Sequence, residues 1–70
     1  MDKFEIRRGD VIISRDGRTN YVNDRYNYIK YFDYDLKNNE NPSLDIVKIQ
    51  RYVKVLWFYK LKTIYVRKEH

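Results

Sequence analysis

The sequence predicts an all-β fold, a small antiparallel barrel of five to six short strands. Three observations carry this prediction: the chain has only 70 residues, apolar and polar side chains alternate along much of it, and 12 of its residues are aromatic while none is cysteine. A chain of about 60 residues buries only about 60% of its unfolded surface, which suffices for one core. Without cysteine no disulfide framework can replace that core. We therefore expect one domain over residues 1–70.

The first two strands are expected on either side of Asp16-Gly17. Residues 11–13 form a β-branched run that begins after Gly9-Asp10. An Asp-Gly dipeptide suits the positive φ angles of a hairpin turn, so residues 19–22 are predicted as the returning strand.

Further strands are expected over residues 26–34, 44–49, 53–61 and 62–67. Residues 26–34 carry aromatic side chains at both odd and even positions, and a polar loop separates them from 44–49. Between 53 and 61 every odd residue is apolar, which is typical of a strand. The same residues also fit one face of a helix, so an antiparallel sheet plus one C-terminal helix over residues 50–62 is the alternative fold. We prefer the barrel because closure removes exposed sheet edges.

The sequence offers no arrangement of catalytic side chains, and we expect no enzyme. The only histidine is His70, at the end of the chain, where a positioned general base is not expected. Ser14 and Ser43 therefore have no histidine to activate them, and we interpret both as turn or cap residues.

No metal ion or cofactor is expected either. Asp33, Asp35 and Asp45 do not have the spacing of a calcium loop, and we interpret them as loop acids that accept backbone N–H bonds. Gly9 and Gly17 stand alone, whereas a phosphate-binding loop needs several glycines that lead into a helix.

The positive charge lies in the last third of the chain. Residues 1–47 contain eight Lys and Arg and nine Asp and Glu, a net charge of −1, whereas residues 48–70 contain seven basic residues and one acid, a net charge of +6. Aromatic residues are interleaved with these basic ones. This combination suits single-stranded nucleic acid, in which phosphates contact cations and unpaired bases stack on rings. It also fits a plain strand with a solvated basic face.

A partner-binding surface is expected on the same segment. If Trp57 faces the core, then Leu56 and Phe58 face outward on one strand face with Lys54 and Lys60, although the sequence leaves open which of Trp57 and Phe58 is buried. An apolar patch with a charged rim is typical of a protein interface. Tyrosines of the region 21–34 are candidates for recognition or for the core. The predicted partner-binding residues are Lys54, Leu56, Phe58, Lys60, Lys62, Tyr65, Tyr28 and Tyr31.

Two sequence segments resemble a known group of small proteins. These segments are Gly9-Asp10-Val11-Ile12-Ile13-Ser14-Arg15-Asp16-Gly17 and Tyr34-Asp35-Leu36 followed by Leu44-Asp45-Ile46-Val47-Lys48-Ile49. They resemble small uncharacterised proteins of phages and prophages of low-GC Gram-positive bacteria. The resemblance implies an SH3-like barrel and a phage setting, and no activity comes with it. Residues 52–70 depart from the pattern as a basic aromatic C-terminal extension.

These observations predict a non-enzymatic phage or prophage protein that binds a host or phage protein, with inhibition of a host defence factor as one such role. The alternative is a nucleic-acid-binding module that contacts single strands through residues 48–68. A third hypothesis is a homodimer in which strand 53–59 pairs with its copy. No run of about 18 apolar residues and no signal peptide is present, so we expect no membrane partner and a cytoplasmic location in the host cell.

Overall fold

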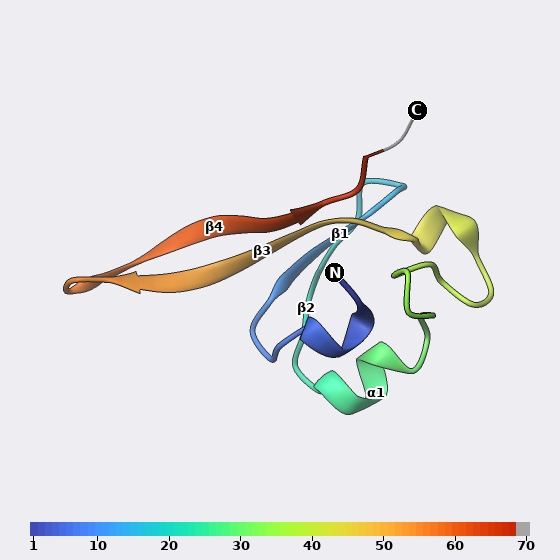
Figure 1. The fold of residues 1–70 in the computed structure, drawn as a ribbon, viewed down its shortest axis with the longest axis horizontal. Helices are drawn as coiled ribbons and strands as arrows, with labels where there is room; N and C mark the ends of the chain where they lie inside the picture. Colours follow the sequence, from blue (N-terminus) through green and yellow to red (C-terminus); the bar gives the residue numbers. More distant parts are fainter. Residues whose placement is uncertain (69–70) are drawn as a thin grey trace.

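The computed structural model describes residues 1–68 as an open antiparallel sheet of four strands with short helical segments on one face (Figure 1). Glu69 and His70 lie outside the described residues. The strand order across the sheet is β2-β1-β3-β4, so β2 and β4 form its two edges. The strands are β1 (Val11–Ser14), β2 (Thr19–Tyr21), β3 (Ile46–Val55) and β4 (Phe58–Val66).

The first hairpin forms as the sequence predicts. β1 and β2 are antiparallel, with Val11 opposite Tyr21 and Ile13 opposite Thr19. Gly17 has a φ of 87°, which a residue with a side chain adopts only with strain, and its N–H donates to the Ser14 carbonyl at 2.9 Å. The Asp16-Gly17 signal therefore identifies the turn correctly.

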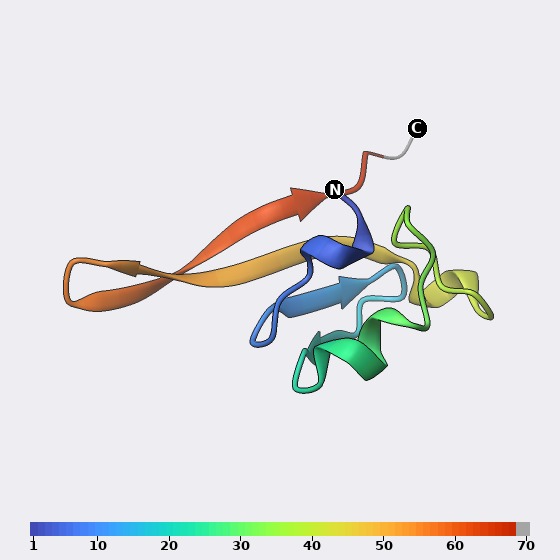
Figure 2. The same ribbon diagram turned by 60° about the horizontal axis from the view of Figure 1, so that its bottom comes forward.

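The second hairpin, formed by β3 and β4, extends beyond the other two strands of the sheet. β1 pairs with β3 only from Ile46 to Gln50, whereas β3 and β4 continue as a pair to Val55 and Phe58. Figures 1 and 2 show these two strands running out together beyond the rest of the chain. We call residues 51–62 the arm and the remaining described residues the body. The arm gives the molecule its longest dimension, 41 Å.

The core lies between one face of the body's sheet and the segments that cover it. These segments include the turns η1 (Lys3–Glu5) and η2 (Pro42–Leu44), the helix α1 (Arg25–Ile29) and the loop between α1 and η2. None of the helices within residues 1–68 is long or apolar enough to cross a membrane. The buried cluster consists of Ile6, Ile12, Val22, Ile29, Phe32, Leu36, Ile46 and Ile49.

Residues 26–34 do not form the predicted strand. The side chain of Asp24 accepts a hydrogen bond from the Asn27 N–H at 3.3 Å and so caps α1. This backbone hydrogen bond is also the largest cause that lowers the pKa of the Asp24 carboxyl. The helix packs Ile29 into the core, and the chain then turns through Phe32. Ile29 and Phe32 are three residues apart, and both are buried in the core. Burial of these two apolar side chains outweighs the strand preference of the tyrosines around them.

The structure confirms a small antiparallel β domain and corrects its details. The sheet has four strands within residues 1–68 rather than five to six, and it stays open instead of closing into a barrel. The alternative with a helix over residues 50–62 is wrong, because these residues form the arm. The continuous strand predicted over 53–61 is also wrong, because the chain reverses at Leu56-Trp57.

One buried ion pair joins the arm to the body. Asp10 is 1% exposed, and the Arg51 guanidinium donates to both of its carboxylate oxygens at 2.8 Å. Arg51 also donates to the Glu5 carbonyl at 2.9 Å, and the Arg7 N–H donates to Asp10 at 2.9 Å. The hydrogen bonds to Asp10 raise the pKa of Arg51 above its ordinary value. The pair therefore connects β3, η1 and the turn before β1.

We predict that Arg51→Met lowers the free energy of unfolding by about 3 kcal/mol, because it leaves a buried carboxylate without its cation. Urea unfolding followed by circular dichroism measures the change. Arg18→Met is the matched control, since Arg18 pairs with Asp16 at 3.0 Å while its side chain is 73% exposed, and such a pair contributes less than about 1 kcal/mol. Equal losses in the two variants would contradict the prediction.

Candidate functional site

The arm has two faces, and the pairing of β3 with β4 assigns each side chain to one of them. Residues directly opposite each other in an antiparallel pair share a face, and successive residues alternate. Val53 lies opposite Lys60 and Val55 lies opposite Phe58, on the same face as Arg51, whose side chain reaches the covered side of the body. We call this the inner face. The outer face carries two pairs, Tyr52 opposite Leu61 and Lys54 opposite Tyr59.

The loop of the arm holds two exposed apolar side chains. Leu56 and Trp57 form a two-residue connection between Val55 and Phe58, and they are 74% and 84% exposed. Leu56 has a φ of 55°, a left-handed conformation that costs a residue with a side chain about 1–2 kcal/mol and glycine almost nothing. Leu36 also has a positive φ, of 67°, but its side chain is buried in the core, whereas Leu56 exposes its side chain to solvent.

The arm is also basic on both faces. Lys54 lies on the outer face and Lys60 and Lys62 lie on the inner face, and no Asp or Glu occurs from Ile46 to Lys68. The arm therefore has no internal counter-charge. An anionic partner fits this surface, whereas a basic partner would be repelled.

Both edges of the arm are free. Among residues 1–68, β3 has no strand neighbour beyond Gln50 except β4, and β4 is the edge strand of the sheet along its whole length. The outward N–H and C=O groups of such edges can pair with another strand. Lysines on an edge strand, here Lys60 and Lys62, oppose non-specific pairing with further copies.

The structure separates the residues that the sequence places on one binding face. Leu56 lies in the loop, whereas Lys54 lies on the opposite face from Phe58, Lys60 and Lys62. The prediction that Leu56, Phe58 and Lys54 share a face is wrong, because the chain reverses at Leu56-Trp57. Neither Trp57 nor Phe58 faces the core; both rings are exposed, with their centroids 6.4 Å apart in an edge-to-face arrangement.

Tyr65 occupies a different environment from the arm. It pairs with Ile49 in the body, is half-buried, and packs against the core cluster. Its ring is therefore less available to a partner than the rings of the arm.

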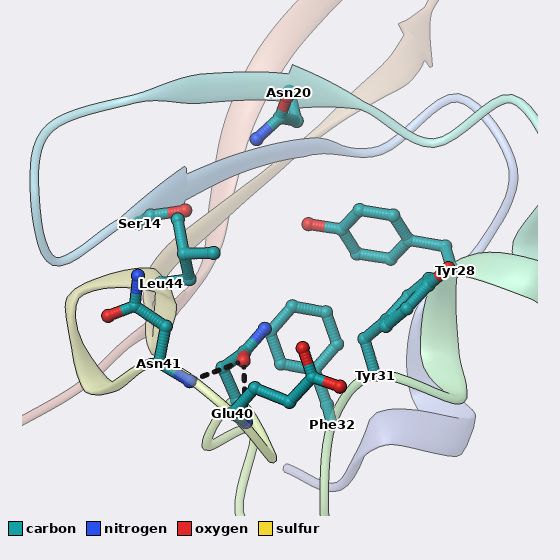
Figure 3. Close-up of a pocket in the computed structure, with 9 residues that line it drawn as sticks. Ser14, Asn20, Tyr28, Tyr31, Phe32, Glu40, Asn41 and Leu44 are labelled. Atoms are coloured by element: carbon teal, nitrogen blue, oxygen red, sulfur yellow. Dashed lines mark hydrogen bonds between the residues drawn. The ribbon is translucent and has the colours of Figure 1, made fainter.

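Tyr28 and Tyr31 line a cavity of about 460 Å³ in the body (Figure 3). The Tyr28 ring packs against Phe32 at a centroid distance of 5.3 Å, and Figure 3 shows its hydroxyl directed into the cavity. Burial raises the pKa of Tyr28 to about 12, because the phenolate is poorly solvated there. The remaining lining residues are Ser14, Asn20, Phe32, Asn38, Glu40, Asn41 and Leu44.

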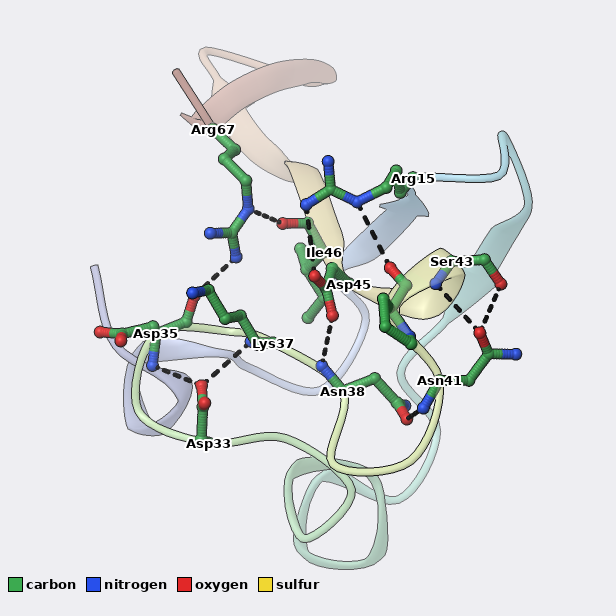
Figure 4. A network of polar contacts seen from close by, with 11 residues as sticks. Arg15, Asp33, Asp35, Lys37, Asn38, Asn41, Ser43, Asp45, Ile46 and Arg67 are labelled. Carbon is green, nitrogen blue, oxygen red and sulfur yellow. Dashed lines mark hydrogen bonds and ion pairs between the residues drawn. The ribbon is translucent and has the colours of Figure 1, made fainter. Parts of the chain in front are cut away.

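Polar contacts hold the loop that forms one wall of this cavity (Figure 4). The Asp45 carboxylate accepts a hydrogen bond from the Asn38 N–H at 2.7 Å and pairs with Arg15 at 3.2 Å. Arg67 donates to the Ile46 carbonyl at 3.0 Å and to the Asp35 carbonyl at 2.6 Å. The predicted loop acid Asp45 therefore accepts a backbone N–H, as Asp33 does from residues 35 and 37.

Two arginines that the sequence analysis did not single out lie next to the arm. Arg7 and Arg8 belong to the turn that ends at Asp10, and they line a hollow together with Tyr52. The dipeptide Arg7-Arg8 before Gly9 is visible in the sequence, but its position beside the arm comes from long-range contacts, the pairing of Val11 with Gln50 and the ion pair of Asp10 with Arg51.

Comparison of the chain with models of protein families, with curated proteins and with solved structures finds no match. Within residues 1–68 no group of three or more His, Cys, Asp or Glu side chains could hold a metal ion.

We predict that Tyr28 makes stability fall between about pH 10 and pH 12. The folded-state pKa is about 12 against an unfolded value of about 10, so the unfolded chain loses its proton first and is favoured as pH rises through this window. Urea unfolding at about pH 9 and about pH 11 measures the effect, and Tyr28→Phe should unfold with a smaller alkaline loss. The same alkaline loss in both proteins would contradict this assignment.

Proposed function

We propose that this chain is a non-enzymatic interaction protein that binds a partner protein through the inner face and the loop of its arm. One observation carries the proposal: the arm extends beyond the body with Val55, Leu56, Trp57 and Phe58 exposed. A two-stranded hairpin is normally stabilised by packing its apolar side chains against a further layer of the protein, and the arm has no such layer among residues 1–68. A partner that covers these side chains supplies that burial.

The size of this apolar surface fits a protein interface. With Trp57 84% and Leu56 74% exposed, the loop and inner face present on the order of 500 Å² of apolar area, and patches of that size on small proteins are often functional. A standard interface buries about 800 Å² on each partner. Lys60 and Lys62, on the inner face, extend the apolar patch as a polar rim.

Charge favours an acidic partner over a second copy of the chain. Pairing two arms would place Lys54, Lys60 and Lys62 near the same residues of the copy, with no acid between Ile46 and Lys68 to neutralise them. An acidic protein surface, by contrast, complements the arm and accelerates its association.

A phage or prophage setting in a low-GC Gram-positive host, a cytoplasmic location and kinship with SH3-like barrels are parts of the same proposal. They rest on the resemblance carried by residues 9–17 and 34–49. The open sheet is compatible with that kinship in its antiparallel β1-β2 hairpin and in the pairing of β1 with β3. A host defence factor with an acidic surface is a candidate partner.

The test is capture of partners from a nuclease-treated lysate of a low-GC Gram-positive bacterium by immobilised protein. The variant Leu56→Gly/Trp57→Ser removes both loop side chains and places glycine at the position of positive φ, where a type II′ hairpin turn favours it. We expect the native chain to retain a protein partner at a stoichiometric ratio. The amount of this partner that the variant captures should be at least tenfold lower.

Tyr26→Ser is the matched control, because Tyr26 is exposed on α1, away from the arm. It should capture the partner as the native chain does. Glycine at residue 56 should leave the thermal unfolding midpoint unchanged or raised, since it relieves backbone strain. Equal capture by the loop variant, or the absence of any arm-dependent protein, would refute the proposal.

A further inference from the structure

The outer face of the arm, opposite the surface proposed for the protein partner, carries its own set of exposed aromatic and cationic side chains. We infer that this outer face, together with the turn before β1, binds single-stranded nucleic acid. The inference does not depend on the proposed protein partner, because it uses different residues. It rests on a cationic hollow, two exposed tyrosine rings and the absence of acidic side chains on this face.

The hollow lies at the root of the arm and has a volume of about 310 Å³. Arg7, Arg8, Gly9 and Asp10 line it from the body, and Arg51 and Tyr52 line it from the arm. Gly9 has a φ of 91° at the third position of a turn closed by the Asp10 N–H and the Arg7 carbonyl at 3.1 Å. This geometry requires a glycine and places the two arginines side by side on an exposed turn.

Arg7 and Arg8 supply the unpaired positive charge of the hollow. Both residues are exposed, and among residues 1–68 neither guanidinium has a carboxylate partner. The one acid that lines the hollow, Asp10, is already neutralised by Arg51. A guanidinium binds phosphate through two parallel N–H donors, so the hollow fits a phosphate group.

Tyr52 and Tyr59 supply two stacking rings next to the hollow. They are 53% and 68% exposed, and they lie on one face because Tyr52 is opposite Leu61 and Tyr59 is two residues away from Leu61 on the same strand. Diagonal neighbours of this kind are about 7–8 Å apart along the backbone, so both rings are within reach of the same bound strand. Lys54, opposite Tyr59, can contact a second phosphate.

The arginines and the tyrosine rings together favour a single-stranded nucleic acid over other anionic ligands. Phosphate alone would need only the arginines, and an acidic protein would need no row of exposed rings beside them. Bases that are paired in a duplex cannot stack on side chains, whereas unpaired bases can. A strand of alternating phosphates and unpaired bases uses both parts of the surface.

The test measures fluorescence anisotropy of labelled 12-nucleotide DNA and RNA single strands, with the duplex of the same sequence as the comparison. We expect tighter binding of a single strand than of the duplex. Three cationic contacts predict that log K falls with log salt concentration with a slope of about −2, since each phosphate contact on a single strand contributes about −0.7.

Two pairs of variants with matched changes distinguish a specific site from electrostatic attraction of the oligonucleotide by the net charge of the protein. Arg7→Ala/Arg8→Ala should reduce the salt slope by about 1.4, while Lys30→Ala/Lys37→Ala, which removes the same charge from the exposed body, should leave it unchanged. Tyr52→Ala should weaken binding by between about fivefold and a hundredfold, while Tyr26→Ala should not weaken it. Leu56→Gly/Trp57→Ser should bind the oligonucleotide as the native chain does.

Four outcomes would overturn the inference. Equal affinity for the duplex would show that unpaired bases are not recognised. Equal effects of the two charge-matched pairs would show attraction by net charge only. Unchanged binding by Tyr52→Ala would remove the stacking step. Displacement of the oligonucleotide by an equal charge of poly-glutamate would assign the surface to an acidic polypeptide instead.

Discussion

The ion pair between Asp10 and Arg51 is the contact on which the arrangement of body and arm depends. It joins the point where β3 leaves the body to two neighbouring segments near the N-terminus, η1 and the turn before β1. The Arg7 N–H donates a further hydrogen bond to the buried carboxylate, and a buried charge is tolerated when it is both paired and hydrogen-bonded. Together with the pairing of Val11 with Gln50, this contact holds the turn that carries Arg7 and Arg8 beside the arm.

The arm itself is stable through its attachment rather than through a core of its own. An isolated two-stranded hairpin is at best marginally stable in water. Here the first half of β3 pairs with β1, and Ile49 is buried in the core, so the register of the arm is fixed at its root. The two faces beyond Gln50 consequently remain accessible at once. The two proposed ligands, a protein on the inner face and a single strand on the outer face, therefore do not compete for the same side chains.

The sequence predicts those parts of the structure whose signals are local. Asp16-Gly17 identifies the first turn, and the β-branched residues at 46–49 identify the start of β3. The turn at Leu56-Trp57 was missed because neither residue is a turn former, and the apolar alternation continues through it. Helix α1 was missed because its tyrosines favour a strand, while the cap at Asp24 acts on only five residues.

For the candidate site, composition points to a segment but not to its geometry. The basic aromatic extension over residues 52–70 remains a predicted binding region, and its division into two faces depends on where the chain reverses. Arg7 and Arg8 lie beside this segment because of two tertiary contacts, the pairing of Val11 with Gln50 and the ion pair of Asp10 with Arg51. The open arm also divides the chain into two zones of different local opening free energy. Amide hydrogens beyond Arg51 should exchange with solvent through separation of β3 and β4 alone, whereas those at Ile12 and Ile49 await unfolding of the whole core.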